Sequence, residues 1–242
     1  MASANWRGTV GVVKPTYESG SLVEFIRLLP EGVGVIPVYA GIKEHTEQGY
    51  LAAMETYHRC VAELANIGVH LMHPEGGPPF MVRGYKGEQE IVRGWEEKHK
   101  VPIFTSGMTQ TEALRALGIR KFVGCTYYRD NKLNEIFTGY FTDAGFEVLG
   151  MEGMDTSPGE AKSLSSETIY HHIKRSFLKY PGAQGIYLLG SGAWRVLDVI
   201  PAEEDLGVPV VHPVAARVWY VQKRLHVRQP VQGAGQLLAA LP

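Results

Sequence analysis

Apolar residues along the chain alternate between short runs rich in Val and Ile and longer stretches with helical spacing. The short runs fall at residues 9–13, 33–38, 69–72, 101–104, 121–125, 146–149, 185–189 and 208–211. They are continuously apolar rather than alternately polar, which is typical of strands whose two sheet faces are both covered by helices. The pattern therefore predicts parallel strands enclosed by helices.

The stretches between these runs predict helices. On roughly one face, residues 47–67 carry Leu51, Met54, Val61 and Leu64, as an amphipathic helix requires. Further helices are predicted at residues 88–99, 110–117, 132–144, 167–180 and 214–225. Gly118 and Gly145 follow two of them, at the position where a left-handed glycine commonly ends a helix. The tail after residue 229 contains Pro and Gly, which favours a loose segment.

The order of strands and helices repeats. Residues 8–110 run strand, helix, strand, helix, strand, glycine-rich turn, helix and strand, and residues 119–212 repeat that order. Strand–helix repeats imply parallel sheets with right-handed crossovers. The sequence therefore predicts an α/β fold of two pseudo-symmetric lobes with a cleft between them. The first lobe spans residues 1–110 and is completed by a C-terminal helix at 213–228, and the second spans residues 111–212.

Composition narrows the class of protein. The 242 residues include 24 Lys or Arg and 25 Asp or Glu, for a net charge of −1. No basic stripe points to a nucleic-acid partner. The longest apolar runs are strand-sized, well short of the ~18 residues needed to span a bilayer, and the N-terminus has no signal-peptide pattern. Cys60 and Cys125 cannot form a disulfide framework. We therefore expect a cytoplasmic protein with no nucleic-acid or membrane partner.

Parallel sheets bind ligands beyond the carboxyl ends of their strands, and the third apolar run ends in a chemically rich turn. His73 and Glu75 bring titratable side chains to this turn, and Gly76 and Gly77 allow close approach of backbone N–H groups to an anion or a developing oxyanion. The plainer interpretation is a structural turn in which the histidine is simply hydrogen-bonded.

Other strand ends add candidate ligand-binding groups, namely Lys14, Glu18, Thr126, Tyr127, Tyr128, Ser191, Gly192 and His212. For the tyrosines the plainer interpretation is core packing, and for Lys14 and Glu18 it is a solvated, capped turn. Ser191 lies in only part of a nucleophile elbow, because that motif would require Gly at position 189. No nucleotide-binding glycine motif follows the first strand.

A metal site is a weaker alternative. His73, Glu75 and His212 would supply two imidazoles and one carboxylate. No HxH, HExxH or CxxC spacing supports such a site, so we expect no bound metal.

Several segments, taken in order, resemble a known family. They are residues 25–33, 112–118, 126–128, 133–135, 144–148, 197–201 and 207–211, together with Trp219. In sequence and spacing they are similar to the aspartate/glutamate racemase superfamily, within it the branch of maleate cis-trans isomerase and arylmalonate decarboxylase. The resemblance runs over nearly the whole chain.

The resemblance implies two flavodoxin-like lobes, a cleft at their pseudo-twofold axis and no cofactor. Members of the branch use one or two cysteines as acid, base or nucleophile, and hold a carboxylate or enediolate with backbone N–H groups and hydroxyls. Here the first cysteine turn corresponds to residues 74–77, which lack cysteine, and the second cysteine corresponds to Ser191. An asparagine after the first strand is replaced near Glu18. Tyr128 carries over as an oxyanion donor, with the Gly192 backbone beside it.

The leading hypothesis is therefore a cofactor-independent lyase or isomerase, similar to a decarboxylase or tautomerase, that acts next to a carbonyl or carboxylate of a small organic acid. Glu75 would replace the thiol as acid or base, with its pKa raised by desolvation beside residues 78–80. Tyr128, Ser191 and the glycine N–H groups would stabilise the enediolate. His73 or His212 would relay the proton.

Two acidic side chains argue against a diacid substrate. Glu18 and Glu75 would repel a second carboxylate unless Lys14, Arg83 or a protonated histidine compensates. The sequence thus favours a monoacid, a neutral carbonyl compound or an amine-bearing molecule. The alternatives are a hydrolase or hydratase in which Glu75 and a histidine activate water, with or without a metal, and a non-catalytic small-molecule binder. Relatives often form dimers, so the resemblance also allows a homo-oligomer.

Overall fold

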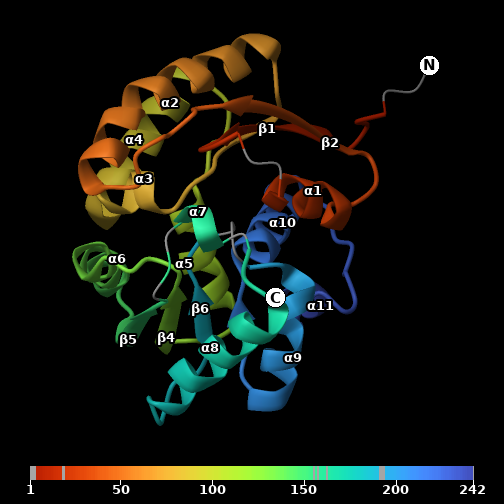
Figure 1. The fold of residues 1–242 in the computed structure, drawn as a ribbon. Coiled ribbons are helices and arrows are strands. Elements are labelled where there is room, and N and C mark those ends of the chain that lie inside the picture. Colours follow the sequence, from red (N-terminus) through yellow and green to blue (C-terminus); the bar gives the residue numbers. More distant parts are fainter. Residues whose placement is uncertain are drawn as a thin grey trace.

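A computed structural model describes residues 4–17, 20–154, 156, 158–161, 163–190 and 194–241. These residues form two parallel sheets (Figure 1). The first has the order β2-β1-β3 and contains β1 (Gly8–Lys14), β2 (Val33–Tyr39) and β3 (Leu71–Pro74). The second has the order β5-β4-β6-β7 and contains β4 (Lys121–Thr126), β5 (Glu147–Gly153), β6 (Ile186–Leu188) and β7 (Val210–Val211).

Helices enclose both sheets and confirm the predicted α/β class. They are α1 (Gly20–Leu28), α2 (Glu47–Ile67), α3 (Pro78–Met81), α4 (Gly84–His99), α5 (Ser106–Ala116), α6 (Asn131–Asp143), α7 (Pro158–Ala161), α8 (Ser166–Leu178), α9 (Val196–Leu206), α10 (Pro213–Arg224) and α11 (Gln236–Ala240). The longest, α2, has the predicted bounds because both of its ends are well specified. Thr46 caps its first turn through the Gly49 N–H, and Gly68 ends it at φ 82°.

The central strands of the two sheets are the most deeply buried. In β1 every residue but Thr9 is buried, and in β4 every residue but Lys121. The edge strands β2 and β5 are half-exposed along most of their length. Burial on both faces explains why the central strands are continuously apolar in the sequence.

The two sheets have matching strand orders, as the repeat in the sequence predicts. Strands β2, β1 and β3 correspond to β5, β4 and β6. At the position of β7, the first sheet has an isolated parallel bridge between Met72 and Ile103. The prediction of a strand at residues 101–104 is therefore wrong. Pro102 has no N–H to donate to a neighbouring strand, and the chain enters the cap of α5 at Thr105.

Helix α10 lies between the two sheets and packs against α5 and α1 (Figure 1). It is buried from Pro213 to Gln222. The following tail, predicted to be loose, instead forms α11, in which Leu237 and Leu238 are buried. Apolar contacts with α10 outweigh the tail's Pro and Gly content. In the described part of the chain, no helix combines the length and the apolar character needed to cross a bilayer.

The buried carboxyl group of Glu88 links α4 and Thr105, which precede β4, to α6, which follows it. Glu88 of α4 is fully buried and accepts hydrogen bonds from the Thr105 hydroxyl at 2.6 Å and from the Tyr140 hydroxyl of α6. Burial raises the pKa of Glu88 to about 7, although both hydrogen bonds act in the opposite direction. Small changes in pH around 7 therefore change the ionised fraction of this carboxyl group.

Candidate active site

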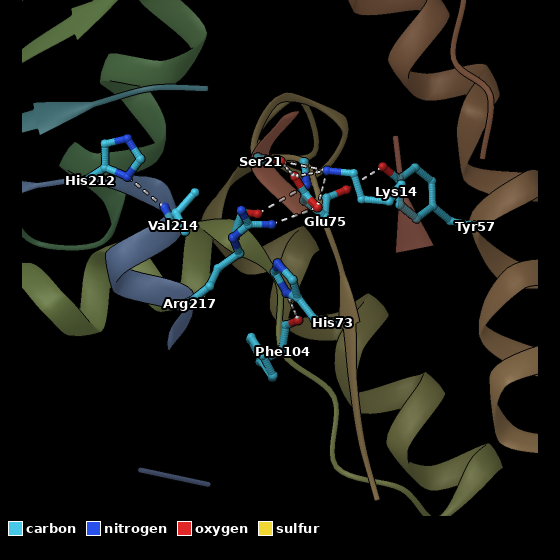
Figure 2. Close-up of polar contacts among 11 residues, drawn as sticks. Lys14, Ser21, Tyr57, His73, Glu75, Phe104, His212, Val214 and Arg217 are labelled. Carbon is cyan, nitrogen blue, oxygen red and sulfur yellow. Dashed lines mark hydrogen bonds and ion pairs between the residues drawn. The ribbon is translucent and has the colours of Figure 1, made fainter. Parts of the chain in front are cut away.

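Glu75 lies between two cations at the carboxyl ends of β1 and β3 (Figure 2). Lys14 Nζ donates hydrogen bonds to Glu75 Oε1 at 2.8 Å and Oε2 at 2.7 Å. Arg217 Nη1, from α10, lies 2.7 Å from Glu75 Oε2. The Ser21 hydroxyl of α1 accepts from Lys14 at 2.7 Å and donates to Glu75 at 3.0 Å. All three charged side chains are almost completely buried.

The parallel register of the first sheet brings these groups together. Val13 of β1 pairs with Pro74 of β3, so Lys14 and Glu75 leave neighbouring strands at the same edge. The Glu75 N–H then donates to the Val13 carbonyl at 2.9 Å, and the Tyr57 hydroxyl of α2 donates to the Glu75 carbonyl at 2.5 Å. The backbone at Glu75 is therefore fixed from two sides, which holds its carboxylate against the cations.

The charge state of Glu75 differs from the sequence-based expectation. Burial alone raises the pKa of Glu75, but Arg217 and Lys14 more than offset burial and hold it well below its usual range. The prediction of a pKa raised toward neutrality is therefore wrong, because the side chain contacts cations instead of an apolar pocket. In the resting protein Glu75 is an ionised carboxylate, which can accept a proton but not donate one.

Arg217, Ser21 and Tyr57 contact Glu75 but were not among the candidates from the sequence, and Arg217 is the charged one. The guanidinium is 1% exposed. Nη1 is ion-paired with Glu75, but none of the three nitrogens has a well-aligned hydrogen bond to a residue that the structure describes. Its ion pair with Glu75 thus leaves most of its donors available, and its carbon lies 5.1 Å from the Phe25 ring. A buried guanidinium with unused hydrogen-bond donors suits a planar carboxylate ligand. One charged residue inside an apolar helix was the signal that could have revealed it.

Both candidate histidines are neutral. Burial is the largest cause that lowers the pKa of His73 and of His212 to about 3. His73 Nδ1 donates to the Phe104 carbonyl at 3.0 Å, and the ring stacks on Phe104 (Figure 2). His212 Nδ1 accepts the Val214 N–H at 3.0 Å and caps α10. Neither can compensate acidic charge as an imidazolium, contrary to one of the sequence-based possibilities.

Tyr128 follows β4 and is held by its own turn. Its hydroxyl lies 2.9 Å from the hydroxyl of Tyr50, and its ring stacks on Tyr127 with centroids 4.9 Å apart. The Thr126 hydroxyl accepts the Tyr128 N–H and donates to Asn134 at 2.9 Å. Burial raises the pKa of Tyr128 well above its usual value, so the phenol stays protonated. Tyr128 can donate a hydrogen bond, whereas Thr126 is engaged in holding the turn.

The two glycines after Glu75 differ. Gly76 has φ +114°, and a Cβ there would approach the Tyr57 hydroxyl to 3.0 Å. Its N–H donates to the Ser106 hydroxyl at 3.1 Å and is thus already engaged. Gly77 is the N-cap of the short helix α3. Of the two, Gly77 better fits the predicted role of a backbone donor.

Glu18, Ser191 and Gly192 lie outside the described residues. Within those residues, no group of three or more His, Cys, Asp or Glu side chains could hold a metal ion. Cys125 is buried in β4, where burial raises its pKa to about 12. Cys60 in α2 also has a raised pKa and faces the Tyr39 carbonyl. Neither cysteine therefore carries a reactive thiolate at neutral pH.

Two solved enzyme structures share this fold. The maleate isomerase from Pseudomonas putida S16 matches 97% of this chain and 99% of its own, with a TM-score of 0.89 and 20% identity. A liganded double mutant of arylmalonate decarboxylase matches 96% of this chain and 98% of its own, with a TM-score of 0.88 and 21% identity. This likeness shows that the chain has the two-sheet α/β fold of these structures.

Sequence relatives agree with this likeness. Arylmalonate decarboxylase from Bordetella bronchiseptica is 27% identical over 213 residues, covering 87% of this chain and 88% of the relative. Maleate isomerase from Alcaligenes faecalis is 23% identical over 205 residues, covering 81% and 80%. Residues 11–238 match the family described as arylmalonate decarboxylase, and the chain belongs to that family. The resemblance inferred from the sequence is confirmed.

Proposed function

We propose that this protein is a cofactor-independent lyase or isomerase that acts next to the carboxylate or carbonyl of a small organic acid. The observation that carries the proposal is the ionised Glu75 held between Lys14 and Arg217 at the carboxyl ends of β1 and β3. Membership of a family that contains a decarboxylase, and similarity to maleate isomerase, support the reaction class.

The cations revise the preferred substrate. Lys14 and Arg217 together outnumber the charge on Glu75, so this carboxylate does not by itself repel an acidic substrate. Glu24 of α1 is half-buried and accepts the Val196 N–H at 2.8 Å, and burial raises the pKa of this carboxyl group. Arg217 would bind the substrate carboxylate with its available donors. A substrate with one or two carboxylates therefore fits the site better than a neutral or amine-bearing molecule.

In the racemase or tautomerase form of the reaction, ionised Glu75 takes a proton from the carbon next to the substrate carbonyl or carboxylate. A substrate carboxylate that pairs with Arg217 would offset the positive charge beside Glu75 and so raise its basicity for this step. The electron pair of the broken C–H bond moves onto oxygen to give an enolate or enediolate. The Tyr128 hydroxyl and the Gly77 N–H would donate hydrogen bonds to that oxyanion, each worth about 3 kcal/mol. Return of the proton to carbon completes the reaction.

In the lyase form, carbon dioxide leaves and the electron pair of the C–C bond forms the same enediolate. Carbon then needs a proton, which ionised Glu75 cannot supply by itself. The Lys14 ammonium, hydrogen-bonded to both Glu75 oxygens, would supply it through Glu75 and be recharged from water. From the family resemblance we further propose that Ser191 and the Gly192 N–H face the enediolate from the opposite lobe.

The test is a panel of small acids incubated with the protein in D₂O and followed by proton NMR. Arylmalonates report decarboxylation, maleate reports cis–trans isomerisation, and 2-arylpropionates report exchange of the α-proton. We expect turnover or exchange with at least one class, and a loss of more than a hundredfold in Arg217→Met but not in the matched Arg224→Met. Acid binding without any turnover would overturn the proposal in favour of a binder, and activity abolished by chelation would favour the metal-assisted hydrolase.

A further inference from the structure

We propose that His45 is a positioning residue that directs the Tyr50 proton toward Tyr128, so that the Tyr128 proton is available to the substrate oxyanion. The inference rests on the proposed function, because it assigns how one oxyanion donor of that reaction is oriented. Neither His45 nor Tyr50 was a candidate in the sequence analysis.

Three side chains form a continuous hydrogen-bonded row. His45 Nδ1 lies 3.2 Å from the Tyr50 hydroxyl, and the Tyr50 hydroxyl lies 2.9 Å from the Tyr128 hydroxyl. His45 precedes α2, Tyr50 is in the first turn of α2, and Tyr128 follows β4. The row therefore runs from the half-exposed His45 to a tyrosine at the carboxyl end of the second sheet.

Each hydroxyl in the row has a single proton, which limits what it can do. If Tyr128 donates to Tyr50, the Tyr128 proton is already engaged and is not available to a ligand. If Tyr50 donates to Tyr128, the Tyr128 proton is not used in the bond to Tyr50. The Tyr127 hydroxyl also bonds to Tyr128, and when it too donates, the Tyr128 proton can meet a developing oxyanion. The two arrangements have the same heavy-atom positions, so a third group must decide between them.

His45 is the group that can decide. When its proton is on Nδ1, the imidazole donates to the Tyr50 oxygen, and Tyr50 donates onward to Tyr128. When Nδ1 is unprotonated, it accepts the Tyr50 proton and the row points away from the substrate. Burial lowers the pKa of His45, so the neutral ring predominates at pH 7 and its tautomer sets the direction.

The charged side chains near His45 do not decide which of its ring nitrogens carries the proton. Lys43 and Glu44, on the same segment, are exposed. Glu47 of α2 is paired with Lys132 of α6 at 2.7 Å. Among the described residues no ion pair to the His45 imidazole is seen, so none competes with its hydrogen bond to Tyr50.

The kinetic test uses paired substitutions in the full-length protein. His45→Leu removes the donor, whereas His45→Asn keeps an N–H near the position of Nδ1. We expect His45→Leu to lower kcat about tenfold with little change in KM, and His45→Asn to restore most of the loss. In a Tyr128→Phe background, His45→Leu should have no further effect, since the two act as one unit. The exposed His171→Leu serves as the control.

The second measurement is independent of turnover. Nitrogen-15 NMR of the histidine side chains at pH 8 should show the His45 proton on Nδ1. A proton on Nε2, or a His45→Leu effect that is additive with Tyr128→Phe, would overturn the inference. A wild-type protein without activity toward any acid would instead overturn the proposed function, and the NMR result alone would then decide the orientation of the row.

Discussion

At the scale of single residues, a charged neighbour decides what a buried acid can do. Sequence alone pointed to Glu75, Lys14 and Tyr128, because they lie at the carboxyl ends of strands in the two parallel sheets. It gave the wrong direction for the pKa of Glu75, since the decisive cation, Arg217, lies 142 positions away on α10. Contacts over such sequence distances depend on the folded arrangement and leave no local pattern.

Glu75→Gln tests the coupling between charge and stability at this residue. The change leaves Lys14 and Arg217 buried without their carboxylate, so we expect a loss of about 3–5 kcal/mol in the free energy of unfolding. Because folding lowers the pKa of Glu75, its stabilisation is present above the unfolded pKa near 4.5 and fades as the pH falls. Urea unfolding at pH 7 and pH 3 should thus differ less in Glu75→Gln than in the wild type.

A matched control is Glu112→Gln, which breaks an exposed ion pair with Arg115. That change should alter the free energy of unfolding by less than about 1 kcal/mol. Equal effects of the two substitutions would contradict the account of Glu75 as a buried, paired carboxylate.

At the scale of elements, hydrophobic periodicity predicted most helices and strands but not the effect of tertiary contacts. The ends of α2 were predicted to the exact residue. Its C-terminal end is well specified because Gly68 takes a conformation that glycine adopts readily. Residues 101–104 have the composition of a strand but form a single bridge around Pro102. The tail has the composition of a loop, yet forms α11 because α10 offers an apolar surface.

Leu238→Ala tests whether α11 is part of the folded core. Leu238 is 0% exposed, and truncating a buried leucine usually lowers the free energy of unfolding by about 2–5 kcal/mol. Chemical denaturation measures the loss. Leu178→Ala, at a side chain that is 64% exposed, should have little effect, and a similarly small effect of Leu238→Ala would indicate that the tail is detached in solution.

At the scale of the whole molecule, two related halves meet through buried polar groups. Matching strand orders were predictable from the repeated order of elements. The bonds that join the halves were not, because Glu88, Thr105 and Tyr140 come from separate elements with no shared motif. The boundaries of the two lobes remain a prediction, because helices α5 and α10 pack against each other.

Glu88 should make the stability of the whole fold depend on pH. The pKa of Glu88 is about 7 in the folded protein, whereas the usual value of 4.5 applies to the unfolded chain. Its contribution to the free energy of unfolding is therefore fully present below pH 4.5 and is lost as the pH rises through 7. The shift corresponds to about 3 kcal/mol. Glu88→Gln should flatten this dependence in thermal unfolding between pH 5 and 8. A wild-type melting temperature that rises steadily over that range would contradict the assignment.

The paired cations beside Glu75 also bear on how the site could be re-engineered. A sulfhydryl introduced by Glu75→Cys would lie near an ammonium and a guanidinium, both of which favour the anionic form of sulfur. Such a variant should be alkylated by iodoacetamide at pH 6, where the native Cys60 and Cys125 are inert. The position that here holds a carboxylate is therefore already suited to nucleophilic sulfur chemistry.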